Sequence, residues 1–335
     1  MTLQNTKQLK IISSWLYVGL ILVILMVVIG GVTRVTNSGL SMVDWRFISD
    51  MKPPLNESEW VNIFERYKQF PEYQKINNSM ELTDFKRIFF WEYTHRLLGR
   101  IIGLIFIIPF LFFLAKRWLK NNLKKRLLKL LILGSLQGFL GWFMVKSGLI
   151  DTPKVSHFRL AMHLGVAYLI IGYIYWIILN ISKQQKICNS TINHLLKLFV
   201  YILTIQIIYG AFVAGTDAGF LKSSHEINTI YGYFNPDNMR DFNLLSNPYN
   251  IQFIHRTLGW FIAIFGILIF IKTKKTKYQK TGSVIFFLII LQVTLGVISI
   301  LYSMPNTIRI LHQFIPIIIL LLSLNIIYLS SQNSQ

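Results

Sequence analysis

The sequence predicts an all-α polytopic membrane protein whose eight transmembrane helices form two parallel-repeat four-helix bundles. Three observations predict this fold: eight apolar stretches of membrane-spanning length, basic connections that alternate with neutral or acidic ones, and motifs that recur in the same order in both halves. With 53% hydrophobic and 14% charged residues and a mean hydropathy of +0.49, the composition also differs from that of a soluble domain.

The apolar stretches have the length of about 20 residues that a helix needs to cross a bilayer. They lie at residues 11–32, 88–115, 127–146, 158–180, 195–215, 251–271, 283–302 and 308–329. The hydrocarbon interior offers no water to backbone N–H and C=O groups, so a segment of this kind is expected to bond its own backbone as a helix.

The charged residues that give the chain its net charge of +20 are distributed unevenly among the connections between these stretches. Residues 116–126, 183–197 and 272–280 carry basic side chains and no acidic ones, whereas residues 34–87 hold eight of each sign and residues 216–250 are net acidic. This positive-inside pattern predicts that both termini lie in the cytoplasm, and we expect a multi-pass protein of the cell inner membrane. The excess charge is then a topology signal with attraction to lipid headgroups, and no nucleic-acid motif accompanies it.

An internal duplication relates the first four stretches to the last four. Four pairs of segments align in order: 30–39 with 210–219, 95–99 with 255–259, 136–141 with 291–296, and His163 with His312. An even number of helices in each copy gives both copies the same orientation. We therefore expect an N-terminal four-helix repeat at residues 1–185, with a long outer loop at 33–87, and a C-terminal four-helix repeat at residues 186–335. Facing side chains inside such bundles commonly hold cofactors.

The long outer loop has no counterpart in the second repeat. Asn56 and Glu59 resemble a capping box, and four apolar residues follow at helical spacing: Trp60, Ile63, Phe64 and Tyr67. We expect an amphipathic helix on the outer face of the protein or the membrane; the alternative is a packed lid without chemistry. The chain's single cysteine, Cys188, allows neither an intrachain disulfide nor a cysteine metal site.

Four histidines lie near the outer starts of the second, fourth, sixth and eighth stretches: His95, His163, His255 and His312. An ionisable side chain inside a membrane is costly and therefore indicates function. We expect His95 to face His163 in the first bundle and His255 to face His312 in the second, as axial ligands of haem iron. For a single histidine, a hydrogen bond between helices would be an equal explanation.

The residues around these histidines support the same interpretation. Gly99 and Gly259 lie one turn after a histidine on the same helix face, where a missing side chain would admit a flat macrocycle. Four arginines could pair with propionates, or could instead extend to lipid headgroups: Arg96, Arg100, Arg256 and Arg309. A repeated glutamine is expected to hydrogen-bond between helices rather than to bind metal, at Gln137, Gln206 and Gln292. No role is assigned to His157, His194 or His225.

Glu92 distinguishes the two repeats. It precedes His95 by three positions, so both side chains share a helix face, and its counterpart in the second repeat is Gln252. A carboxylate beside a haem can take part in proton transfer or stabilise a developing positive charge. The first half is therefore expected to perform acid–base chemistry, and the second to hold a stable cofactor. The alternative role for Glu92 is an ion pair with Arg96.

The chain resembles the heme A synthase family in motifs that span nearly all eight helices. These motifs are residues 30–34 (GGVTR), 38–41 (SGLS), 89–100 (FFWEYTHRLLGR), 134–138 with 141–142, 155–161 (VSHFRLA), 214–219 (AGTDAG) and 253–256 (FIHR). The first outer loop looks most like the proteobacterial and mitochondrial branch. Some bacterial members carry a cysteine pair in this loop, which this sequence lacks, so a thiol-based step is not carried over.

The resemblance implies an oxidoreductase that converts haem O to haem A for cytochrome oxidase assembly, by two hydroxylations of the C8 methyl group. By the family pattern, Glu92, His95 and His163 would form the catalytic site for the substrate haem O. His255 and His312 would hold a permanent haem b. Implied partners are the haem O substrate, heme O synthase and an unidentified electron donor, and the chain could form a homo-oligomer.

Two other function classes remain open. A di-haem electron-transfer protein, such as a cytochrome b-type quinol oxidoreductase, would fit the duplicated histidines equally well. Glu92 in only one repeat favours an enzyme. A transporter predicts inverted repeats or broken helices, and the sequence shows neither.

Overall fold

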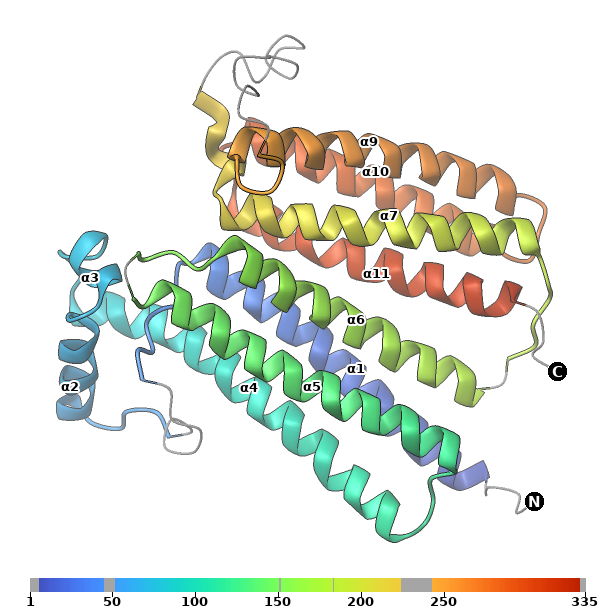
Figure 1. The fold of residues 1–335 in the computed structure, drawn as a ribbon, viewed down its shortest axis with the longest axis horizontal. Coiled ribbons are helices and arrows are strands. Elements are labelled where there is room, and N and C mark those ends of the chain that lie inside the picture. The colour runs from blue at the N-terminus through green and yellow to red at the C-terminus, as the bar shows by residue number, and fades with distance from the viewer. Residues whose placement is uncertain (1–5, 45–51, 151, 183, 224–242, 332–335) are drawn as a thin grey trace. The chain divides into compact units, whose positions relative to one another are not determined.

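The computed structural model has helices and no strand in the residues that it describes, namely 6–44, 52–150, 152–182, 184–223 and 243–331 (Figure 1). Eight of the described helices are long and apolar enough to cross a membrane: α1 Thr6–Val35, α4 Leu82–Ala115, α5 Asn121–Gly148, α6 His157–Ser182, α7 Ser190–Gly215, α9 Pro248–Thr273, α10 Gln279–Leu301 and α11 Asn306–Ser330. Each coincides with one predicted stretch. The all-α, multi-pass membrane fold is therefore confirmed.

Shorter elements lie between these helices: α2 Glu57–Tyr67, α3 Pro71–Lys75 and the 3₁₀ helix η2 Ala218–Ser223. The predicted capping box starts α2, because the Asn56 side chain accepts a hydrogen bond from the Glu59 N–H at 2.9 Å. Asn247 caps α9 in the same way through the N–H of Tyr249 at 2.9 Å. Both caps satisfy donors that a helix start leaves unpaired.

The chain divides into two compact units, the first mainly of residues 18–170 and the second mainly of residues 171–335. In the second unit, α7 packs on α9, α9 on α10, α10 on α11, and α11 on α7 (Figure 1), which is a closed four-helix arrangement. In the first unit, α4 packs on α5, and glycine contacts join α1 to α4 and α5 to α6. The repeat boundary between residues 185 and 186 stays a prediction.

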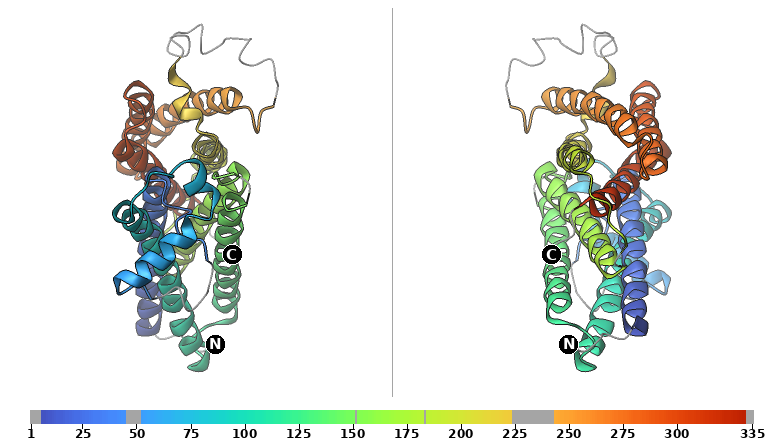
Figure 2. Two further views of the ribbon diagram at one scale, coloured as in Figure 1. Left: turned by 90° about the vertical axis from the view of Figure 1, so that its left-hand side faces the viewer. Right: turned by 90° about the vertical axis from the view of Figure 1, so that its right-hand side faces the viewer.

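An aromatic cluster joins the segment that precedes α4 to the first turns of that helix. Phe64, Tyr67, Phe85 and Phe89 are buried together with Met42, and Figure 2 shows α2 and α3 at the beginning of α4. We call α2, α3 and the connection to α4, residues 57–81, the lid. Because its apolar side chains lie against α4, the expected helix packs on the protein. The packing of Phe85 in this cluster also explains why α4 begins at Leu82, six residues before its apolar stretch.

The lid contains a buried carboxylate, Glu72, which is only 6% exposed. The Tyr67 hydroxyl donates to Glu72 Oε2 at 2.9 Å, and Asn77 Nδ2 donates to Tyr67 at 2.8 Å. Burial raises the pKa of Glu72 to about 7, with a further contribution from the negative charge of Glu92, while the hydrogen bond from Tyr67 lowers it. Glu72 is therefore expected to change charge near neutral pH.

This pKa predicts a pH-dependent lid. Between about pH 4.5 and about pH 7 the folded lid retains a proton that the unfolded segment loses, so lid stability should fall as pH rises through this window and level off above it. Hydrogen exchange in residues 57–81 should report up to about a tenfold loss of protection per pH unit. The Glu72→Gln variant, compared with the unsubstituted protein at each pH, should lack this loss; an equal loss in both would contradict the assignment.

Candidate functional site

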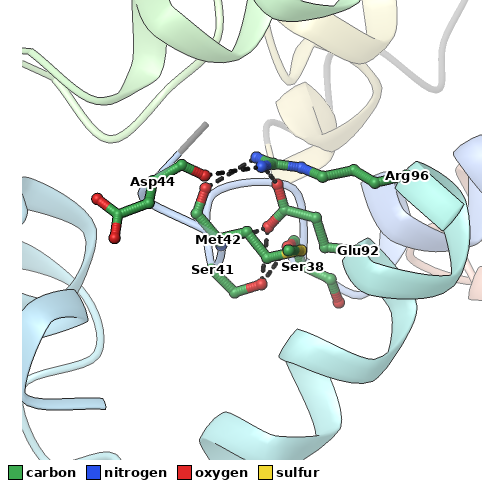
Figure 3. Close-up of polar contacts among 6 residues, drawn as sticks. All are labelled: Ser38, Ser41, Met42, Asp44, Glu92 and Arg96. Carbon is green, nitrogen blue, oxygen red and sulfur yellow. Dashed lines mark hydrogen bonds and ion pairs between the residues drawn. The ribbon is translucent and has the colours of Figure 1, made fainter. Parts of the chain in front are cut away.

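Glu92 lies in a cage formed by the turn that follows α1 (Figure 3). The Ser41 hydroxyl and the Met42 N–H approach Glu92 Oε2 at 2.7 and 2.8 Å, and the carboxylate is 3% exposed. A buried charge is tolerated only when it is paired and hydrogen-bonded. The local fold therefore supplies two donors aimed at one carboxylate oxygen.

Arg96 completes this cage, because its Nη2 lies 2.6 Å from Glu92 Oε1. The same guanidinium donates to the carbonyls of Met42 and Asp44, at 2.8 and 3.1 Å (Figure 3). The ion pair considered as the alternative role of Glu92 is therefore present. The ion pair does not explain why Ser41 and Met42 also donate to Glu92. Arg96 itself binds the carboxylate and two main-chain carbonyls.

The second unit has the same turn without the charge. Asn37 and Asp217, which align in the duplication, both have left-handed backbone angles, with φ of 50° and 55°. After the second of these turns, Gln252 Nε2 donates to the carbonyl of Ala218 at 3.0 Å and is 6% exposed. A donor in the second unit therefore occupies the place of the acceptor Glu92 in the first.

Each of the four predicted histidines contacts a glycine on a neighbouring helix. A Cβ added to that glycine would lie 3.0–3.3 Å from the imidazole, in four pairs: Gly30 with His95, Gly141 with His163, Gly210 with His255, and Gly296 with His312. The glycines were part of the aligned motifs, but their contact with the histidines was not predicted. The duplication could have indicated it, because each of these glycines lies at one end of a segment that recurs in both halves.

The histidines of the second unit face each other. The ring centroids of His255 and His312 lie 6.3 Å apart, with the ring planes at 68°. Two imidazoles that bind one metal from opposite sides need centroids about 6 Å apart, since each metal–nitrogen bond is about 2 Å. The facing of His95 and His163 in the first unit stays a prediction.

The ring nitrogens have the bonding capacity that an iron ligand needs. The Nδ1 atoms of His163, His255 and His312 are buried and have no hydrogen-bond partner among the described residues, although buried polar atoms are normally paired. Nowhere in the described ranges do three or more His, Cys, Asp or Glu side chains form a metal cluster. A pair of imidazoles suits haem, whose macrocycle supplies the other iron ligands.

The repeated glutamines form hydrogen bonds between helices, as predicted. Gln206 Nε2 donates to the main-chain oxygen of His255 at 3.0 Å, and Gln292 Nε2 donates to that of His312 at 2.8 Å. Gln137 Nε2 instead lies 3.4 Å from His163 Nε2.

Four further residues named in the sequence analysis lie outside the histidine pairs and the cage of Glu92. Arg309 lies over the Phe220 ring at 5.3 Å and donates to Asn306. His194 is exposed and lies against the Ser190 carbonyl. The centroid of the His157 ring lies 4.1 Å from that of the Phe158 ring, at a tilt of 37°, and Cys188 is an exposed free thiol. His225 lies outside the described residues.

Comparison with known proteins gives one consistent result. A family model described as "Cytochrome oxidase assembly protein" (COX15-CtaA) matches residues 13–324. A heme A synthase of Flavobacterium psychrophilum is 42% identical over 328 residues, which cover 94% of this chain and 96% of the relative.

Two other relatives carry the same name. The Rickettsia felis protein is 40% identical and covers 93% of this chain and 96% of its own length. The Nitrosospira multiformis protein is 38% identical and covers 91% of this chain and 89% of its own length. With the family model matching nearly the whole chain and several relatives near 40% identity, this protein belongs to the heme A synthase family.

Proposed function

We propose that this protein is an enzyme that converts haem O to haem A, oxidising the C8 methyl group to a formyl group by two successive hydroxylations. The second hydroxylation would give a gem-diol, which loses one water. The observation that carries this proposal is the difference between two otherwise matching turns: a caged carboxylate, Glu92, in one unit, and an amide, Gln252, in the other.

In this proposal, His95 and His163 hold the substrate haem in the first unit. Glu92 is positioned close to it by sharing a helix face with His95. Its Oε2 atom, with hydrogen bonds from Ser41 and Met42, can accept and return the proton that moves when the diol forms and loses water. Arg96 balances the charge of the carboxylate when Glu92 is ionised.

The second unit would hold a resident haem b between His255 and His312. When bound, this group supplies a one-electron redox centre. The chain's own contribution is to fix both imidazoles through glycine contacts and through the amides of Gln206 and Gln292. The electron donor stays open. We also propose an inner-membrane location with both termini in the cytoplasm, and a functional link to heme O synthase.

Expression of the full chain in cells that make haem O should produce haem A, detected by chromatography of extracted haems. An empty vector in the same cells is the control. If only haem O is found while the purified protein carries haem b, the chain is a di-haem electron-transfer protein and the proposed activity is wrong. Absence of any haem from the purified protein would reject both functions.

A further inference from the structure

Three of the four histidines have a hydrogen-bond contact with a glutamine, and for the fourth the corresponding position is a methionine. The glutamine lies four residues before the glycine that contacts the histidine, in α5 (Gln137 and Gly141), α7 (Gln206 and Gly210) and α10 (Gln292 and Gly296). In α1 the same place before Gly30 belongs to Met26. The exception therefore belongs to His95, in the unit that carries Glu92.

Met26 occupies the same position in the first unit as Gln206 does in the second. A Cβ added to Gly99, one turn after His95, would lie 3.2 Å from the Met26 methyl carbon. A Cβ added to Gly259, one turn after His255, would lie 3.8 Å from Gln206 Nε2. The two side chains thus fill corresponding spaces between corresponding helices.

The chemical difference is a hydrogen-bond donor. Gln206 and Gln292 each join two helices by donating to the main-chain oxygen of a histidine. Methionine has no N–H or O–H group and cannot form this bond. Gln137 contacts the ring of its histidine instead of the main chain. In the second unit, a glutamine amide therefore binds the main-chain oxygen of each histidine, an interaction that we call the amide clamp. Met26 cannot provide an amide clamp for His95.

A resident cofactor and a substrate place opposite demands on their ligands. A resident haem is retained best by ligands whose helices are tied together. A substrate haem must enter and a product haem must leave, which requires those helices to separate and close again. Methionine suits a moving contact because its thioether is flexible and packs in many arrangements.

We propose that Met26 sets the exchange of haem at His95: the missing amide clamp lets the first unit release its haem, and Gln206 and Gln292 retain haem in the second. This inference rests on the proposed function and assigns a positioning role to a residue outside the histidines and Glu92. Met26 is therefore a determinant of which half turns over its haem.

The test compares Met26→Gln with Met26→Leu in the purified, haem-loaded, full-length protein. Haem release is followed by transfer to excess apomyoglobin, and the haem left on the protein is extracted and identified by chromatography. One added hydrogen bond should slow release of haem O and haem A roughly three- to tenfold in Met26→Gln. Met26→Leu, which adds no donor, should release them at the original rate.

The reciprocal change tests the second unit. Gln206→Met should speed the loss of haem b by roughly three- to tenfold, while Thr204→Val, at an exposed site on the same helix, should not. Thermal unfolding of each haem-free variant separates a loss of fold from a change in haem retention. If Met26→Gln does not fold, the Gln206→Met measurement decides the proposal.

Equal release rates for Met26→Gln and Met26→Leu would overturn the inference, and so would unchanged haem b loss in Gln206→Met. Neither result affects haem A formation by the unsubstituted protein. If the unsubstituted protein makes no haem A, the proposed function itself fails, which is a separate outcome.

Discussion

Replacing Glu92 by glutamine is expected to lower haem A formation by at least about a hundredfold, the usual contribution of a general acid–base group, while the haem b spectrum is retained. The substitution preserves shape but removes the negative charge and replaces one of the two acceptor oxygens by an NH2 group, so the donors of Ser41 and Met42 on one side and of Arg96 on the other can no longer all be satisfied. Haem A per mole of purified protein, from chromatography of extracted haems, measures the loss, and the absorption spectrum of the reduced protein reports haem b.

A double variant separates acid–base chemistry from ion pairing. Glu92→Gln alone leaves the buried Arg96 without its carboxylate partner, which is itself destabilising. Glu92→Gln with Arg96→Gln removes both charges and leaves two amides that can bond to each other. If haem A formation returns in the double variant, Glu92 serves only as a partner for Arg96. Continued loss in a folded double variant supports acid–base chemistry.

The two histidine pairs are expected to respond differently to alanine. His255→Ala should remove the stably bound haem b, because the facing pair loses one of the two rings whose centroids lie 6.3 Å apart. His95→Ala should retain haem b and lose haem A formation. The pyridine haemochrome of each purified variant gives haem b per chain, and haem extraction gives activity.

His194→Ala is the matched control, because this histidine is exposed on α7 and contacts only a nearby carbonyl among the interactions described for it. It should keep both haem b and activity. Equal retention of haem b in His95→Ala and His255→Ala would refute the division of labour between the two units. Loss of haem b in both would refute it as well.

Much of the fold could be predicted because membrane-spanning helices depend on a simple property, the length of an apolar stretch. All eight helices were found in this way. The start of α4 was not predicted, because residues 82–87 are helical although they lie outside the apolar stretch. Phe85 is held in the helix by contacts with the lid. Such contacts depend on residues distant in sequence, so hydropathy does not reveal them.

The histidines and Glu92 could be selected from the sequence because ionisable residues are rare within apolar stretches. The groups around them could not. Met42 reaches Glu92 through a backbone N–H, which every residue except proline possesses, so its identity gave no signal. The main-chain bonds of Gln206 and Gln292 were predicted only as contacts between helices, since sequence does not show which atom accepts them.

Met42 belongs to two structures at once. Its side chain packs in the aromatic cluster of the lid, while its N–H and carbonyl bind Glu92 and Arg96. Two features of the first unit, the lid and the carboxylate of Glu92, therefore meet at one residue. The two are mechanically coupled: a substitution that loosens the packing of the lid around the Met42 side chain is expected also to displace the main-chain groups that hold Glu92 and Arg96.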